Sequence, residues 1–174
     1  LASFPLAERG LNQYGRWFHP EYKQGFRYLF AYGYFGAGKY KEALKWTNEM
    51  IVNYPKETLE EYYNFARIFI LLIYFGLGHD GLLGSEMRSA KRYFKNREKL
   101  YAFEKILIDF MRKALAPEGI KVSREDFKEL KNKISKIRKG PYEQQLFSLF
   151  DWEAWAESKI RGISFEESMK AKNP

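Results

Sequence analysis

Apolar residues recur along most of this chain every three or four positions, which is the spacing of one face of an α-helix. No stretch sustains the strict alternation of apolar and polar residues that is typical of a half-buried β-strand. The pattern therefore predicts an all-α protein. Three series show the helical spacing most clearly: Tyr40, Ala43, Leu44, Thr47, Met50 and Ile51; Leu83, Met87, Ala90 and Phe94; and Phe127, Leu130, Ile134 and Ile137.

Proline, glycine and capping residues divide this pattern into separate helices. Pro20 suits the first turn of a helix, because its missing N–H would be unpaired there in any case. Gly38 can end that helix, and Pro55 stops the next one. Capping boxes are predicted at Thr58 with Glu61, Ser123 with Asp126, and Ser164 with Glu167. The predicted helices cover about residues 5–17, 20–37, 40–53, 58–77, 81–95, 97–115, 124–139, 142–160 and 164–172.

Short connections between these helices favour antiparallel neighbours. We therefore expect a single domain, residues 1–174, built as an α-α superhelix. Residues 5–17 can be half of a preceding helix pair. The expected pairs cover about residues 20–53, 58–95, 97–139 and 142–172.

One segment of the chain is repeated forty residues later, which is typical of helical-repeat proteins. Both copies end one predicted helix and lead through a tight turn into the next. A glycine suits such a turn because it adopts positive φ without strain. With Gly38 aligned on Gly78, four further identities follow: Arg27 with Arg67, Tyr34 with Tyr74, Phe35 with Phe75, and Gly36 with Gly76.

The first copy resembles the tetratricopeptide (TPR) pattern. Its matches are Phe30 and Ala31 at the Leu and Gly positions, Tyr34 at the Tyr, Ala43 at the first Ala of the second helix, and Pro55 at the closing Pro. It departs from the pattern at Arg27, Thr47 and Met50, which stand at the Trp, Phe and second Ala positions. The second copy matches at Leu71, Tyr74 and Ala90, but Leu83 replaces an Ala. The period is 40 rather than about 34 residues.

This resemblance implies a TPR-like right-handed solenoid of antiparallel helix pairs. It also implies partner binding along a concave face lined by the first helix of each pair. Residues 63–78 and 151–162 are similar to parts of uncharacterised helical-repeat proteins of Bacteroidetes, which supports the fold and adds nothing about chemistry.

Composition narrows the class of protein further. Apolar residues make up 45% and charged residues 30%, as in globular chains, and the aromatic count is high, with 15 Phe, 13 Tyr and 4 Trp. The absence of Cys excludes disulfides, thiolate metal sites and cysteine nucleophiles. The longest apolar run, residues 68–75, is too short to span a bilayer, and no signal segment opens the chain. We expect a cytoplasmic protein without membrane partners.

Motifs for catalysis or cofactors are weak. Residues 33–39 have the glycine and lysine spacing of a phosphate-binding loop, but Tyr40 follows Lys39 where such a loop needs Ser or Thr. A predicted helix also precedes the segment, where the loop needs a strand. His19 and His79 lie far apart, without partners at metal-ligand spacing. We expect no enzyme, no metal and no cofactor.

The repeated polar residues are the most specific candidates for a binding site. Arg27 and Arg67 can offer a guanidinium fork to a carboxylate or phosphate, or they can be ordinary helix-surface cations. Tyr34 and Tyr74 lie two turns further along the same stripe, where they can bind a ligand or pack between helix pairs. These four residues form the predicted groove of a protein- or peptide-binding scaffold.

Positive charge suggests an alternative function. The net charge is +8, and residues 61–100 and 101–140 contribute +3 and +5 of it. A solvated helix face explains such charge, but a phosphate-tracking patch on RNA or DNA is the alternative. The alternative is therefore a nucleic-acid-binding or regulatory module that uses the basic region 88–139. Its predicted patch is Arg88, Lys91, Arg92 and Lys95.

Overall fold

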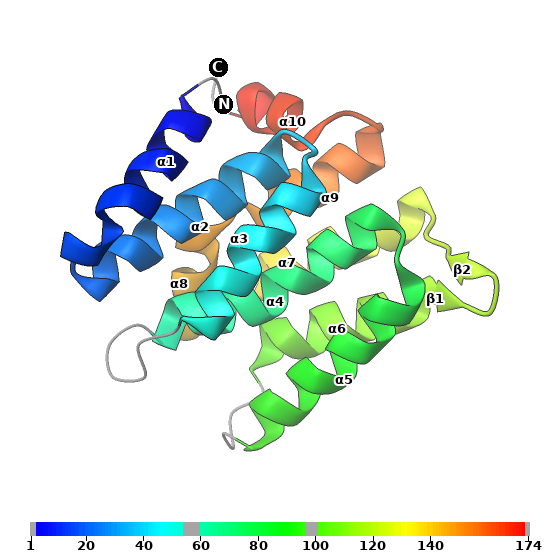
Figure 1. Ribbon diagram of the computed structural model, residues 1–174. Helices are drawn as coiled ribbons and strands as arrows, with labels where there is room; N and C mark the ends of the chain where they lie inside the picture. The colour runs from blue at the N-terminus through cyan, green and yellow to red at the C-terminus, as the bar shows by residue number, and fades with distance from the viewer. Residues whose placement is uncertain (1–2, 54–59, 97–100, 173–174) are drawn as a thin grey trace. The chain divides into compact units, whose positions relative to one another are not determined.

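The computed structural model describes residues 3–53, 60–96 and 101–172, and these are almost entirely α-helical, as the sequence predicts (Figure 1). The chain forms two compact units, an N-terminal unit, Leu1–Ile73, and a C-terminal unit, Tyr74–Pro174. The helices of each unit pack in adjacent pairs. The described elements are α1 (Phe4–Tyr14), a 3-10 turn (Gly15–Trp17), α2 (Pro20–Gly36), α3 (Tyr40–Val52), α4 (Glu60–Leu77), α5 (Asp80–Asn96), α6 (Ala102–Ala114), β1 (Leu115–Ala116), β2 (Gly119–Ile120), α7 (Arg124–Ile137), α8 (Pro141–Leu149), α9 (Trp152–Arg161) and α10 (Phe165–Lys172).

The N-terminal unit is built around the antiparallel pair α2 and α3. Phe30 of α2 packs on Trp46 of α3 with ring centroids 4.8 Å apart. The buried Nε2 of Gln24 donates to the backbone carbonyl of Met50 at 2.8 Å, so the amide links the two helices without an unsatisfied donor.

Helix α1 packs against this pair through one aromatic ring and one carboxylate. The Phe4 ring lies edge-on to Phe30 and Tyr34, at 5.4 and 5.3 Å. The indole Nε1 of Trp46 donates to Glu8 at 3.0 Å, and Tyr34 also hydrogen-bonds this carboxylate. Glu8 therefore connects α1 to both helices of the pair.

The repeated glycines form the same turn in both copies. Gly38 and Gly78 have φ of 72° and 69°. The N–H of Lys39 donates to the carbonyl of Tyr34 at 2.8 Å, and His79 donates to Tyr74 at 3.1 Å. This is the Schellman pattern that closes a helix C-terminus. It confirms the predicted turn and leaves these backbone N–H groups bonded within the chain, so none is available to hold phosphate in a loop.

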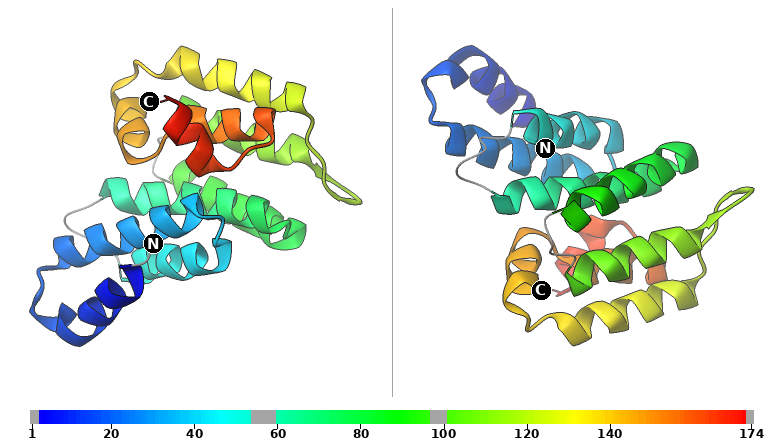
Figure 2. Two further views of the ribbon diagram at one scale, coloured as in Figure 1. Left: turned by 90° about the horizontal axis from the view of Figure 1, so that it is seen from above. Right: turned by 90° about the horizontal axis from the view of Figure 1, so that it is seen from below.

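Aromatic rings form the core of the C-terminal unit. Phe127 of α7 lies 5.2 Å from Phe110 of α6 and 5.7 Å from Trp155 of α9. A further cluster joins Phe150 to Trp152 and Phe165, at 4.7 and 5.0 Å. Both views of Figure 2 show α6 and α7 running side by side, with the short β1–β2 hairpin projecting beyond their ends.

Two elements of the C-terminal unit differ from the prediction. The single helix expected over residues 142–160 is broken at Phe150, whose backbone is extended, and Asp151 then caps α9 by accepting from the N–H of Ala154 at 2.8 Å. The end of α6 leads into a short antiparallel ladder of two residues on each strand, where only helix and loop were expected. Gly119, the first residue of β2, has φ of 108°. The capping boxes at Ser123–Asp126 and Ser164–Glu167 are confirmed, and Thr58 and Pro55 lie outside the described residues.

Candidate functional site

The two repeated arginines have different surroundings. The side chain of Arg27 is only 14% exposed; it donates to Gln24 Oε1 at 3.2 Å and lies 4.0 Å from Glu49. Arg67 is half-buried and folds along its own helix, with two hydrogen bonds to the Tyr63 hydroxyl and its guanidinium over the Tyr63 ring. Equivalent sequence positions therefore do not give equivalent polar contacts.

The two repeated tyrosines are buried. Tyr34 is 7% exposed beneath α1, and burial together with its hydrogen bond to Glu8 raises its pKa to about 12. Tyr74 is 9% exposed and belongs to the C-terminal unit, and burial raises its pKa as well. Both rings have little surface to offer a partner, so the sequence-predicted groove remains a prediction with only Arg27 and Arg67 at partly open positions.

The N-terminal unit does expose an apolar groove, formed by residues that the sequence analysis did not select. It encloses about 350 Å³ between the first half of α2 and the start of α4. Tyr22, Phe26 and Leu29, which follow one stripe of α2, are 70%, 37% and 55% exposed. We call this surface the aromatic groove; it is lined by Glu21, Tyr22, Gly25, Phe26, Leu29 and Tyr62.

The forty-residue register gives this groove a counterpart inside the same unit. Tyr22, Gly25 and Leu29 correspond to Tyr62, Phe65 and Phe69 of α4. Those three α4 residues pack on α2: Tyr62 and Phe65 lie 5.5 and 5.6 Å from Tyr28, and Phe69 lies 4.8 Å from Phe35. The exposed stripe of α2 is thus the face that α4 uses to contact a neighbouring helix.

Gly25 is the main difference between the two faces. It stands where α4 has the fully buried ring of Phe65. No heavy atom of the described residues outside α2's own nearby backbone lies within 4 Å of where its Cβ would be. A glycine inside a helix costs roughly 1 kcal/mol relative to alanine, and no contact with a described residue accounts for it here. It leaves a notch in the floor of the aromatic groove.

The predicted basic patch lies on one exposed face of α5. Arg88, Lys91, Arg92 and Lys95 are all exposed, and none of the four makes an ion pair with a described residue. Helix α7 differs, because its cations are mostly paired with carboxylates. Those pairs are Lys128 with Glu125, Lys131 with Glu157 and Lys133 with Glu129, each at 2.7 Å. Arg138, directly after α7, lies 3.5 Å from Glu153. Four cations without an ion pair to a described residue therefore lie together on α5. Four more lie elsewhere in the described part of the basic region: Lys105, Arg124, Lys136 and Lys139.

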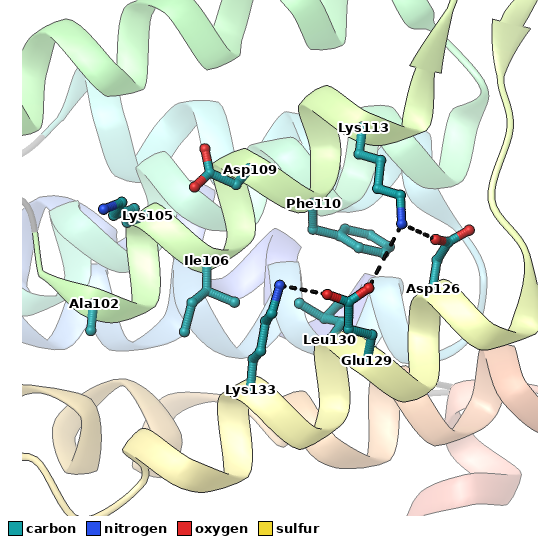
Figure 3. A pocket seen from close by; sticks show the side chains of 10 residues that line it. All are labelled: Ala102, Lys105, Ile106, Asp109, Phe110, Lys113, Asp126, Glu129, Leu130 and Lys133. Atoms are coloured by element: carbon teal, nitrogen blue, oxygen red, sulfur yellow. Dashed lines mark hydrogen bonds and ion pairs between the residues drawn. The ribbon is translucent and has the colours of Figure 1, made fainter.

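A second groove, of about 440 Å³, runs between α6 and α7 (Figure 3). Lys113 lies between Asp126 and Glu129, at 2.6 and 3.7 Å, above the Phe110 ring. The hydrogen bond from Lys113 holds the pKa of Asp126 well below its usual range. Three cations and three carboxylates line this groove, so its charges cancel and it selects no ligand by charge.

The described residues contain no cluster of His, Asp and Glu side chains that could hold a metal ion. Among the helices in the same part of the chain, none has the length and apolar character needed to cross a membrane.

Comparison with known proteins adds no further constraint. No family model, no curated protein and no solved structure matches this chain.

Proposed function

We propose that this chain is a non-enzymatic, TPR-like helical-repeat scaffold that binds a helical segment of a partner protein in the aromatic groove. The observation that carries the proposal is the exposed stripe of Tyr22, Phe26 and Leu29 beside the notch at Gly25. Exposed apolar groups that line one groove mark interaction surfaces more often than scattered ones do.

The contact between α4 and α2 indicates what the partner should present. Helix α4 receives Tyr28 and Phe35, two aromatic residues seven positions apart on α2. By the repeat register, a helix bound in the aromatic groove should present aromatic or large apolar residues at the same spacing. One of these side chains would fill the space that Gly25 leaves where α4 has Phe65. Glu21, the one charged residue among the described lining residues, favours a cation on the partner's flank.

A second copy of the chain fits this role poorly. Its own Tyr28 and Phe35 already pack against its α4, with Phe35 only 2% exposed. Tyr28 and Phe35 could enter the groove of a second copy only if they separated from α4 of their own chain. The proposed occupant is therefore a helix of another protein.

The test compares three baits in pull-downs from native lysate: the wild-type chain, a groove variant and a control variant. The groove variant is Tyr22→Glu with Leu29→Glu. The control is Val52→Glu with Leu82→Glu, which places the same charges on apolar residues that are 80% and 50% exposed outside the groove. All three baits should give the same helical circular-dichroism signal.

We expect proteins captured by the wild type and the control to be lost from the groove variant. Gly25→Phe should also lose them, because the added ring fills the notch, whereas Gly25→Ala should retain them. Equal capture by the groove variant and the control would refute the proposal. If the captured proteins are lost with the groove variant but not with Gly25→Phe, the groove is still the binding surface, but no partner side chain fills the space at Gly25.

The unpaired cations of α5 support a second candidate function, binding of nucleic acid. Four exposed cations within two turns of one helix can contact successive phosphates and release counterions. The experiment is fluorescence anisotropy of a labelled single-stranded RNA at several salt concentrations. Arg88→Gln with Arg92→Gln removes two unpaired cations, and Lys128→Gln with Lys133→Gln removes two paired ones.

If α5 binds RNA, the α5 variant should weaken binding and reduce the slope of log K against log salt by roughly 0.7 for each cation removed. The α7 variant carries the same net charge and should change binding much less. Identical slopes for the two variants, or no binding at low salt, would eliminate this candidate.

A further inference from the structure

The N-terminal unit contains a second cavity, which is polar and lies on a different side of α2 from the aromatic groove. It encloses about 280 Å³ between α1, the following 3-10 turn, α2 and α3. The residues that matter for its chemistry are Arg16, Lys23, Arg27, Lys45, Trp46 and Glu49.

Positive charge dominates this cavity. Arg16 of the 3-10 turn, Lys23 and Arg27 of α2, and Lys45 of α3 all line it, against one carboxylate, Glu49. Among the described residues, no carboxylate lies within ion-pair distance of Arg16, Lys23 or Lys45. Three separate elements therefore line one cavity with four cations that Glu49 neutralises only in part, and a bound anion would reduce their mutual repulsion.

Arg27 is the innermost of these cations. Its guanidinium lies 4.0 Å from Glu49 at the nearest atoms, which is beyond hydrogen-bond distance. Among the described residues, it donates one side-chain hydrogen bond, to the neutral amide of Gln24. Burial lowers the pKa of Arg27, and the nearby Glu49 only partly opposes this effect. The arrangement leaves a largely buried guanidinium with donor groups to spare for an anion.

We infer that this cavity binds the phosphate group of a phosphate monoester. Four lining cations and one carboxylate give this cavity a net charge of +3, which suits a dianion better than a single carboxylate, and the Arg27 fork matches the oxygen spacing of phosphate. The volume exceeds that of phosphate alone, so part of the ester's organic group fits inside. Trp46, which lies beneath the Lys45 ammonium at 5.0 Å, provides an apolar wall for it.

The experiment measures binding by isothermal titration calorimetry at constant ionic strength with four probes: inorganic phosphate, phenyl phosphate, a phosphoserine peptide and acetate. Two variants remove cations of the site. One is Arg27→Met. The other is Arg16→Gln with Lys45→Gln, and because both of these residues are exposed they can be changed without disturbing the core. The matched control is Lys41→Gln, which removes an exposed cation of α3 outside the cavity.

We expect the phosphate probes to bind the wild type and the Lys41 control equally and acetate to bind much more weakly. Each site variant should raise the Kd for phenyl phosphate about tenfold or more, since hydrogen bonds to charged groups are involved. Tighter binding of the phosphopeptide than of phenyl phosphate would assign the site to phosphorylated proteins. The reverse order would assign it to small phosphorylated metabolites. Both outcomes support a phosphate-monoester site. Equal Kd values for all proteins, or equal binding of acetate and phosphate, would overturn the inference.

Discussion

The same substitution, glycine to alanine, should have opposite effects within α2 and in the turn that follows it. At Gly25 the backbone is helical, and a Cβ would meet no described atom beyond the helix's own backbone within 4 Å. At Gly38 the space is equally open, but φ is 72°. Any difference between the two variants therefore comes from backbone conformation, because neither site involves a steric clash.

The magnitudes follow from these conformations. Gly25→Ala should raise the free energy of unfolding by about 0.5–1 kcal/mol, because alanine loses less backbone entropy in a helix. Gly38→Ala should lower it by about 1–2 kcal/mol, the cost of placing a Cβ in the left-handed region. For a chain of this length, 1 kcal/mol corresponds to a shift in Tm of about 2–4 °C.

Thermal unfolding followed by far-UV circular dichroism measures both shifts. A Gly25→Ala variant less stable than the wild type would refute the open notch, because the methyl group would then be displacing something. A Gly38→Ala variant as stable as the wild type would refute the left-handed turn, and with it the structural basis of the repeat.

Three further predictions concern single side chains. Glu8→Ala should cost about 1–3 kcal/mol of unfolding free energy in chemical denaturation, because Trp46 and Tyr34 lose their acceptor; a smaller loss for Trp46→Phe than for Glu8→Ala is expected. Since the Tyr34 pKa is about 12 in the folded chain and near 10 when unfolded, Tm should fall between about pH 10 and 12, and less steeply in Tyr34→Phe. Lys113 holds the pKa of Asp126 below its usual range, so its stabilisation is present at neutral pH and is lost below about pH 4; an Asp126→Asn variant with an unchanged acid titration of Tm would contradict this.

Local signals in the sequence were sufficient for most of the helices. Gly38 and Gly78 ended their helices as predicted, because a positive-φ turn depends on a few neighbouring residues. The break at Phe150 was not predicted, because the apolar spacing continues through it and Asp151 can stand within a helix as well as cap one. The hairpin after α6 is two residues long on each side, too short for a periodic pattern.

The candidate site was harder to predict because this chain has aromatic residues on several faces of each helix. Arg27 and Tyr34 share a stripe in sequence, but α1 covers Tyr34, and periodicity within one helix does not show what packs on it. The sequence does contain a signal for the aromatic groove, because Gly25 aligns with Phe65 in the forty-residue repeat. A ring that is missing from one copy indicates a contact that this copy does not make with the described residues of the unit.

Hydroxyl-radical footprinting of the chain with a protein recovered in the pull-down tests the aromatic groove most directly. Tyr22 and Phe26 line the groove, whereas Tyr14, which is 53% exposed, lies outside it and serves as an internal reference. We predict that bound partner protects Tyr22 and Phe26 from oxidation and leaves Tyr14 unchanged. Unchanged oxidation of Tyr22 and Phe26 in the complex would contradict the assignment of this groove as the binding surface.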